Sequence, residues 1–429
     1  MDQNSAALTT QPPSFGARNR GIVFHAAVFL TSFLILFLRR PDAVLNAQFY
    51  GEDGARRFAD AYQFGWHCLF MPESGYLQTA SRLIALLSLS FPFALAPLVM
   101  NLCALAVQIL PVNLFFTSRF NAIPLQTRFL GSLLYLALPN SFEVHANTTN
   151  MQWHLALAGL LLLLGRAATG RVSGVLSSLI LVLSVLDGAA GILLAPVAVV
   201  LRWKHKDARS GVSLALLVAG AALQTLMILF SDSRRPAPNG VTLQRLISIV
   251  GGQVFLSSTF GLRTSIQLFF GHAQYLFLIQ TIALIAGAAI VFYTFRRGPM
   301  ELKVLLCFAA AILVLALIRP VASTGGEYEQ WEELQVPGVG NRYYFFPMLA
   351  FFASVIWMAT CLTPATRFAR FGALIVLALL PIGIWRDSQY KPFVDYDFKA
   401  FAADFERAAP GTKMSIPINP DWQMMLTKR

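Results

Sequence analysis

Charged residues are scarce in this sequence. Asp, Glu, Lys and Arg together make up 13% of its 429 residues, whereas 56% are hydrophobic and the mean hydropathy is +0.60. Such a composition excludes an ordinary soluble domain. The hydrophobic residues come in blocks of roughly 15 to 25, about the length that crosses a ~30 Å hydrocarbon layer as a helix, and not in the short alternating runs of barrel strands. The sequence therefore predicts an all-α polytopic membrane protein.

Cysteine is also scarce. The four cysteines, Cys68, Cys103, Cys307 and Cys361, are scattered, which argues against a disulfide framework and a thiolate metal site. No small-residue cleavage site precedes the first hydrophobic segment, which we therefore interpret as a retained helix and not a signal peptide.

Acidic residues are fewer than basic ones, which gives a net charge of +12 and a pI near 9.8. In a soluble protein this balance would suggest a nucleic-acid partner, but here the arginines form short clusters between hydrophobic segments. Such clusters mark the cytoplasmic side of a membrane protein, so no nucleic-acid partner is predicted.

About eleven hydrophobic segments are predicted to span the membrane, with the N-terminus in the cytoplasm. They cover residues 21–38, 94–117, 126–140, 153–165, 172–186, 189–201, 211–230, 273–295, 302–319, 343–362 and 371–385. With this alternation, fifteen Lys and Arg residues lie in or beside the cytoplasmic loops, against two acids, Asp207 and Glu301. Arg39 and Arg40 oppose this orientation, but the count over all loops outweighs them.

Two weaker segments, 78–90 and 246–270, are predicted to lie at the membrane interface. Residues 78–90 are a short segment that contains Arg82, and residues 246–270 are only weakly apolar. If residues 78–90 crossed the membrane instead, every later loop would change sides and the basic clusters would face outward. This second orientation stays open.

The predicted organisation is one membrane domain with two tails. A cytoplasmic tail covers residues 1–20, the membrane domain covers 21–385, and a short outer tail covers 386–429. The membrane domain has two longer outer loops, at 39–93 and 320–342.

Ionisable residues are almost absent from the predicted spans and gather on the outer face. A proton or ion pathway needs ionisable groups inside the spans, so their scarcity counts against a transporter. Polar residues within the spans, such as Asn101, Gln108 and Gln224, are typical of helix packing. A carrier for lipid-linked sugars stays open as an alternative to an enzyme with an aqueous site at one membrane surface.

Two adjacent carboxylates, Glu52 and Asp53, follow the first span directly and stand between Gly51 and Gly54. Carboxylates at the membrane surface are costly unless they are paired or used, so this pair is a candidate site. A partly desolvated carboxylate can act as a general base. The alternative is a solvated loop in which the acids pair with the arginines that follow.

Three arginines on the outer face, Arg82, Arg263 and Arg342, are candidates for holding an anion. A guanidinium group binds phosphate with two parallel hydrogen bonds. The alternative for each is that its side chain extends to ordinary phospholipid headgroups.

A dense group of hydrogen-bonding and aromatic side chains lies at the mouth of the fourth span. Such a group can stack on a sugar ring, or it can simply cap the helix. The candidates for substrate binding are His145, Asn147, Asn150, Gln152 and Trp153, with Tyr76 and Tyr343 from the neighbouring outer segments.

These motifs together resemble a known superfamily. The acids just after the first span, the polar outer face and the number of helices resemble the type C (GT-C) integral-membrane glycosyltransferases. The runs Tyr-Gly-Glu-Asp-Gly, Ser-Gly-Tyr-Leu-Gln-Thr-Ala-Ser-Arg-Leu, Asn-Thr-Thr-Asn-Met-Gln-Trp and Asn-Arg-Tyr-Tyr-Phe-Phe-Pro resemble an uncharacterised bacterial branch of it.

The resemblance implies a bacterial inner-membrane enzyme with its site in the periplasm. It would transfer a sugar from a polyprenyl-phosphate donor to a cell-envelope glycan or lipid acceptor, among the membrane lipids. Asp53 would be the general base with Glu52 as its support, and Arg82 and Arg342 would hold the donor phosphate. In the superfamily this acid either acts as the base or helps to hold a metal ion, so a divalent cation, Mg²⁺ or Mn²⁺, stays open as a cofactor. A polymerase or ligase of lipid-linked glycans stays open as a second enzyme class.

Overall fold

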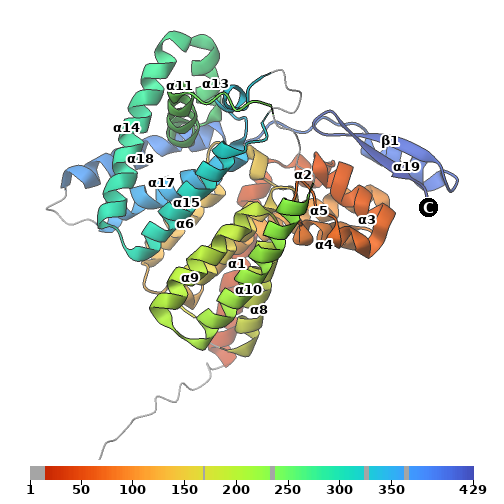
Figure 1. The fold of residues 1–429 in the computed structure, drawn as a ribbon, viewed down its shortest axis with the longest axis horizontal. Coiled ribbons are helices and arrows are strands. Elements are labelled where there is room, and N and C mark those ends of the chain that lie inside the picture. Colours follow the sequence, from red (N-terminus) through yellow and green to blue (C-terminus); the bar gives the residue numbers. More distant parts are fainter. Residues whose placement is uncertain (1–14, 168–169, 232–236, 323–327, 362–366) are drawn as a thin grey trace, which may run out of the picture.

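The protein is a bundle of long helices with a small helical and β-hairpin module at one end (Figure 1). The computed structural model describes residues 15–429 except 168–169, 232–236, 323–327 and 362–366, so most of the predicted tail at 1–20 and part of the loop at 320–342 lie outside the described residues. Within the described part, seven helices are long and apolar enough to cross a membrane. They are α1 (Phe15–Arg39), α5 (Ala96–Phe115), α10 (Ala208–Phe230), α14 (Ala273–Arg297), α15 (Met300–Ile318), α17 (Asn341–Cys361) and α18 (Arg367–Arg386).

Each of the eleven predicted spans contains a helix, but four of these helices are short. They are α6 (Leu125–Leu136), α7 (Met151–Leu164), α8 (Arg171–Leu186) and α9 (Leu194–His205). At ~1.5 Å per residue they extend about 18–24 Å, which is less than the ~30 Å hydrocarbon layer. The second of them, α7, is buried along most of its length, so it packs inside the bundle and need not match the lipid. The chain is a multi-pass membrane protein of the all-α class, with almost no sheet.

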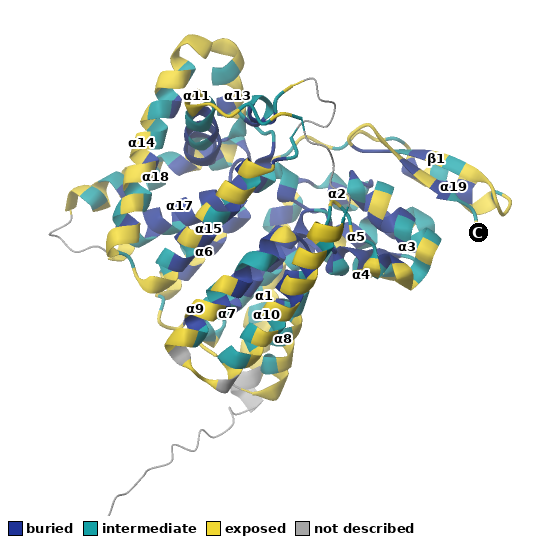
Figure 2. Cartoon of the chain, in the orientation of Figure 1, coloured by how far each residue is buried: buried dark blue, intermediate teal, exposed yellow. Residues whose placement is uncertain are grey.

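Helix α17 is at the centre of the bundle (Figure 2). In its most apolar 18-residue stretch 72% of the residues are buried, against 11% in α1 and in α14. The outward faces of α1 and α14 are apolar and exposed, as expected of surfaces that lipid covers.

The first half of the segment 246–270, which was expected at the interface, is buried: most of residues 248–259 are covered, whereas most of α13 is not. The segment forms the π-helical η7 (Ser248–Leu256), the short α12 (Ser257–Phe260) and α13 (Leu262–Gly271). A Cβ on Gly251 would lie 2.1 Å from the Gln280 carbonyl oxygen of α14. Because these two glycines, Gly251 and Gly252, let the backbones touch, η7 packs against α14 and α17 rather than at the surface.

The tail expected at 386–429 folds against the first outer loop. We call this unit, residues 49–93 and 398–427, the loop–tail module. The loop contributes η1 (Asp53–Phe58), α3 (Ala59–Phe64), η2 (Gly65–Phe70) and α4 (Thr79–Ser88), and the tail contributes α19 (Phe398–Arg407) and the hairpin β1 (Lys413–Ile418) and β2 (Trp422–Thr427). The strands pair antiparallel, from Lys413 opposite Thr427 to Ile418 opposite Trp422.

The loop–tail module has its own aromatic core. Phe398 of α19 is 1% exposed, and its ring lies edge-on to Phe49 and to Phe93, with centroids 5.1 Å apart in each pair. The tail thus buries its apolar face on the loop that carries the two adjacent acids. The 10-residue α4 lies within this module and packs on α5.

Short elements connect the long helices. They are α2 (Asp42–Leu45), η3 (Phe93–Leu95), η4 (Ser118–Phe120), η5 (Phe142–Val144), η6 (Ala189–Leu193), α11 (Leu243–Ile247) and α16 (Gln330–Leu334).

Replacing Phe398 by Ala should loosen the loop–tail module. Removing a buried ring from a packed core costs about 3–5 kcal/mol. We expect faster proteolysis of the tail in detergent solution, while Met425→Ala, at a position 59% exposed, should leave the rate unchanged. Equal protease resistance of the Phe398→Ala protein and wild type would show that the tail does not depend on this core.

Candidate functional site

The two adjacent acids lie in a turn that the tail holds in place. Gly51, just before Glu52, has φ +48°, a left-handed conformation that favours glycine. Its N–H donates to the Asn419 carbonyl oxygen at 2.6 Å, and the Asn419 N–H donates to the Phe49 carbonyl oxygen at 3.2 Å. A Cβ on Gly54 would lie 2.9 Å from the Cβ of Phe49, so Gly54 allows close packing, whereas Gly51, with nothing within 4 Å, serves the turn.

Asp53 points inward to the start of α7. Its carboxylate accepts hydrogen bonds from the Thr148 N–H at 2.9 Å and the Thr148 hydroxyl at 2.8 Å. It also accepts from the Thr149 N–H at 2.7 Å and the Thr149 hydroxyl at 2.6 Å. These donors lie just before the N-terminus of α7, where the partial positive charge of a helix favours an anion.

The carboxylate of Asp53 is 2% exposed and already has four donors. Burial raises its pKa, while the hydrogen bonds from Thr149 and Thr148 and the charge of Arg57 oppose this rise. The Arg57 side chain, 1% exposed, donates in turn to Gln78 of the same module. Asp53 therefore ties two segments together, and its oxygens are not open to a substrate in this conformation.

Glu52 is in the opposite situation. Its side chain is half-buried and forms no hydrogen bond or ion pair with any residue that the structure describes. The exposed Arg56 lies one helical turn further along, and its guanidinium group is 3.8 Å from Glu73. The sequence predicts Asp53 as the general base and Glu52 as its support. In the structure it is Glu52 whose carboxylate is open.

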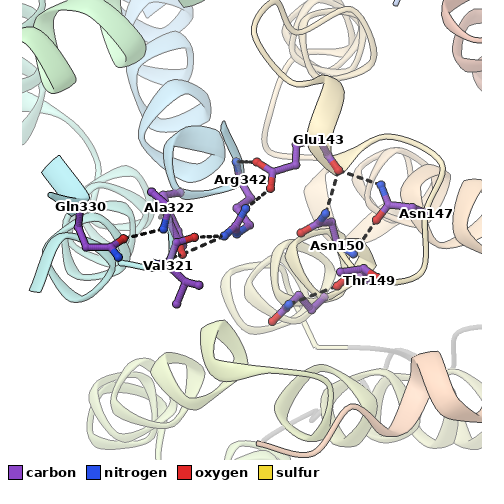
Figure 3. Close-up of polar contacts among 10 residues, drawn as sticks. Glu143, Asn147, Thr149, Asn150, Val321, Ala322, Gln330 and Arg342 are labelled. Atoms are coloured by element: carbon purple, nitrogen blue, oxygen red, sulfur yellow. Dashed lines mark hydrogen bonds and ion pairs between the residues drawn. The ribbon is translucent and has the colours of Figure 1, made fainter. Parts of the chain in front are cut away.

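Arg342 and Glu143 connect two outer segments (Figure 3). Their side chains form an ion pair, and the Arg342 N–H donates to Glu143 at 3.0 Å, which caps the first turn of α17. Arg342 also donates to the Val321 carbonyl oxygen at 2.8 Å and the Tyr343 hydroxyl at 3.1 Å. The Arg342 side chain is 25% exposed, so it can reach a ligand while it stays paired.

Two tyrosines bring these groups into one cluster. Burial raises the pKa of Tyr50 to about 12, with Glu143 and Glu52 adding to the rise and Arg342 opposing it. Burial also raises the pKa of Tyr76. Its hydrogen bond with Gln152 and the charge of Arg342 oppose this rise. Tyr50 and Tyr76 therefore lie where the first outer loop meets the segments around 143–152 and 342–343.

The other two candidate phosphate ligands are engaged elsewhere. Arg82 is 1% exposed and forms an ion pair with Asp60 at 2.9 Å inside the loop–tail module. Arg263 is exposed on α13, and it donates to the Gln389 carbonyl oxygen at 2.9 Å. Neither of these contacts involves Arg342 or Glu143.

Most of the expected substrate-binding group shapes the loop before α7. Asn147 donates to the carbonyl oxygens of Glu143 and His145, and Asn150 donates to the same Glu143 oxygen (Figure 3). His145, 1% exposed, lies edge-on to Tyr390, and Trp153, 7% exposed, packs near Phe346. This matches the capping alternative for the asparagines.

Several residues of the cluster were outside the predicted site. Asp187, at the end of α8, is 1% exposed and accepts from the Ser81 N–H at 3.1 Å and the Ser81 hydroxyl at 3.0 Å. Its sequence context, Leu-Asp-Gly at a turn between two apolar segments, was a signal that could have found it. Thr148 and Thr149 gave no such signal, because their role depends on a partner 95 residues away.

The described residues contain no group of three His, Cys, Asp or Glu side chains placed to hold a metal ion. Asp53 is surrounded by donors, and Glu143 is paired with Arg342. Among the residues that the structure describes, these two acids are therefore not part of a divalent-cation site.

The fold and the site define a multi-pass helical membrane protein with a polar cluster at one end of its helices. No family profile matches the chain, and no curated protein matches it. Among solved structures the chain is similar to the Archaeoglobus fulgidus oligosaccharyltransferase, tethered by a disulfide bond to an acceptor peptide containing the NVT sequon. The identity is 12% and the TM-score 0.47, over 90% of this chain and 57% of that one.

This neighbour is an oligosaccharyltransferase. The present chain spans a little over half of its length. The similarity at this identity says nothing of activity, and the peptide acceptor is a property of that protein.

Asp187 should make the stability of the protein depend on pH. Burial raises its pKa to about 6 from an ordinary 3.8, against the hydrogen bonds from Ser81. The folded protein therefore binds this proton more readily than the unfolded chain, and wild type gains stability as the pH falls from 6 toward 4. The gain is on the order of 3 kcal/mol.

The measurement is the melting temperature in detergent at pH 7.5 and 4.5 for wild type and Asp187→Asn. Because the amide does not titrate, the difference between the two proteins should shift in favour of wild type at the lower pH. Asp404→Asn, at an exposed position, should show no such shift. A constant difference between wild type and Asp187→Asn would mean that Asp187 stays ionised.

Proposed function

We propose that the protein is a membrane glycosyltransferase of the GT-C type. It transfers a sugar from a polyprenyl-phosphate donor to a cell-envelope glycan or lipid acceptor, at the periplasmic face of a bacterial inner membrane. The observation that carries this proposal is Glu52, a half-buried carboxylate without a bonding partner among the described residues, whose charge acts on Tyr50 together with the charges of Glu143 and Arg342. An open carboxylate and a partly exposed guanidinium group are the base and the phosphate ligand that such a transfer needs.

Glu52 is the general base in this proposal, and Asp53 is the positioning residue. The acceptor hydroxyl oxygen forms a bond to the anomeric carbon while its proton passes to Glu52. The bond between that carbon and the phosphate oxygen breaks, and the electron pair leaves with the phosphate. Asp53, held by Thr148 and Thr149, fixes the turn that presents Glu52.

Arg342 and the exposed Arg56 stabilise the phosphate as its charge grows. Arg342 is oriented by Glu143, Tyr343 and the Val321 carbonyl oxygen, so little reorganisation is needed when the phosphate arrives. Tyr50 and Tyr76 carry aromatic faces and hydroxyls beside it, which suits a sugar ring.

A carrier for lipid-linked sugars is less well supported. The mid-span residues Asn101, Gln108 and Gln224 all bond backbone groups of neighbouring segments: Ala43, Ala146 and Leu77. They therefore pack the bundle and do not line a polar path across it. An assay of sugar transfer distinguishes a carrier from a glycosyltransferase.

Replacing Glu52 by Gln should abolish transfer without loosening the fold. Removing a general base lowers the rate by about 10²- to 10⁴-fold, and Glu52 forms no bond whose loss would destabilise the protein. The assay is release of free polyprenyl phosphate from a radiolabelled polyprenyl-phosphate hexose by purified protein, with a cell-envelope extract as acceptor. Asp404→Asn, an exposed acid of the same module, is the matched control.

Asp53→Asn separates the two roles in the same assay. Because the amide loses the charge that four donors surround, we expect a lower melting temperature together with lower transfer. Full activity of Glu52→Gln with complete loss in Asp53→Asn would assign the base to Asp53. No release by wild type, with labelled lipid still crossing proteoliposome leaflets, would support the carrier.

Arg342→Gln should weaken donor binding by about 10- to 100-fold, since hydrogen bonds to charged groups contribute about 1.5–3 kcal/mol. Arg342→Lys should restore part of it, because it keeps the charge but not the two-pronged geometry. Arg263→Gln is the control, since that side chain bonds Gln389 and not the cluster. The measurement is the KM for the donor; an equal rise in the Arg263→Gln protein would remove Arg342 from this role.

A further inference from the structure

A second polar region lies at the other end of the bundle from the candidate site. Helix α7 begins beside Asp53 and ends at Leu164, about 20 Å further at ~1.5 Å per residue. There a cleft of about 640 Å³ opens between α7, α8, α9, α10 and the first turn of α15. Its volume falls within the ~300–1,000 Å³ range of ligand pockets.

The cleft has a cationic rim. Four cations line it, Arg119, Arg166, Lys204 and Arg209, against two acids, Asp207 and Glu301. The Asp207 carboxylate accepts from the Ser210 N–H at the start of α10, so part of its charge stabilises that helix. The rim therefore attracts anions.

Arg119 is the innermost of these cations. It is half-buried, and it donates to the Ser177 hydroxyl at 2.6 Å and to the Arg166 carbonyl oxygen at 3.1 Å. Within the described part of the chain it forms no ion pair with a carboxylate. Burial and the nearby charge of Arg209 lower its pKa. An anion beside Arg119 would offset this half-buried positive charge.

The inner wall of the cleft is apolar. Leu162 of α7, Leu181 of α8, Leu201 of α9 and Val304 of α15 line it, and all four are buried within the bundle. A ligand that fits has a negatively charged head beside the rim and a hydrocarbon chain against this wall. A phosphate ion alone would leave the apolar wall uncovered.

We propose that this cleft is a binding site for one anionic phospholipid. The phosphate contacts Arg119, Arg166 and Lys204, and an acyl chain lies along Leu162 and Leu181. Anionic lipids are enriched in the cytoplasmic leaflet, and the basic loops are predicted to face that side. The site is independent of the proposed transfer reaction, because it lies at the opposite end of α7.

The charge of the rim can be tested with the full-length protein in detergent. The probes are phosphatidylglycerol, phosphatidylcholine and inorganic phosphate, with bound lipid counted by native mass spectrometry. We expect wild type to bind phosphatidylglycerol at least tenfold more tightly than phosphatidylcholine, and Arg166→Gln/Lys204→Gln to lose this preference. Arg297→Gln/Arg367→Gln removes the same charge from α14 and α18, outside the cleft, and should keep it.

Gly174 offers a test that leaves every charge in place. It lines the cleft on α8, and a Cβ there would meet no atom within 4 Å, so Gly174→Leu fills the cleft without displacing a neighbour. Gly372 of α18 is equally open and lies outside the cleft, which makes Gly372→Leu the matched control. We expect Gly174→Leu to lower phosphatidylglycerol binding at least tenfold and Gly372→Leu to leave it unchanged.

Three results would overturn the proposal. Equal binding of the two lipids by wild type would show that the rim does not select charge. Equal loss of binding in both double variants would mean that surface cations outside the cleft contribute to lipid binding as much as those of the rim. Full displacement of the lipid by millimolar inorganic phosphate would identify an ion site and not a lipid site.

Discussion

The contact between Asp53 and the pair Thr148 and Thr149 is the one on which the candidate site depends. It joins the first outer loop to the start of α7 across 95 residues of sequence. A buried carboxylate is costly without donors, and here two backbone N–H groups and two hydroxyls supply them. Because Asp53 turns inward to these donors, its neighbour Glu52 is left open at the other side of the turn.

The two ends of the chain are both needed to build this turn. Asn419 bonds the backbone on each side of Tyr50, and the aromatic core under it combines Phe49 with Phe398. The tail is therefore part of the site: Asn419 holds the turn, and the ring of Phe393 stacks on Tyr50 with centroids 5.2 Å apart. A loop fixed in this way holds a carboxylate in place better than a free loop would.

Lipid accounts for the separation of charge between the ends of the bundle. Charges are costly in hydrocarbon, so the spans are apolar and the polar groups collect where the helices end. The acids Glu52 and Glu143 lie at one end, and the cations around Arg119 lie at the other. The two ends therefore present different groups: acids together with Arg342 at one end, and a group of cations at the other.

Sequence patterns predicted which loops form the candidate site. They did not predict which side chains are paired and which are open. Glu52, Asp53, Tyr76, Gln152, Arg342 and Tyr343 were all predicted for it, and all lie in or around the cluster. Their roles depend on partners that are distant in sequence: Arg82 pairs with Asp60, and Arg342 pairs with Glu143. Whether a carboxylate is open or a guanidinium group is occupied is a property of those contacts, and no local pattern contains it.

The sequence by itself determined the class of the protein and the position of its helices. Hydrophobic segments of a given length must be helical in lipid, since a helix satisfies its own backbone hydrogen bonds. Only the tertiary structure decided that the tail packs on the first loop, that η7 is buried, and that Glu52 and not Asp53 is open. These features arise from close packing and hydrogen bonds between distant segments. The hydropathy of a segment indicates only whether that segment lies in lipid or in water.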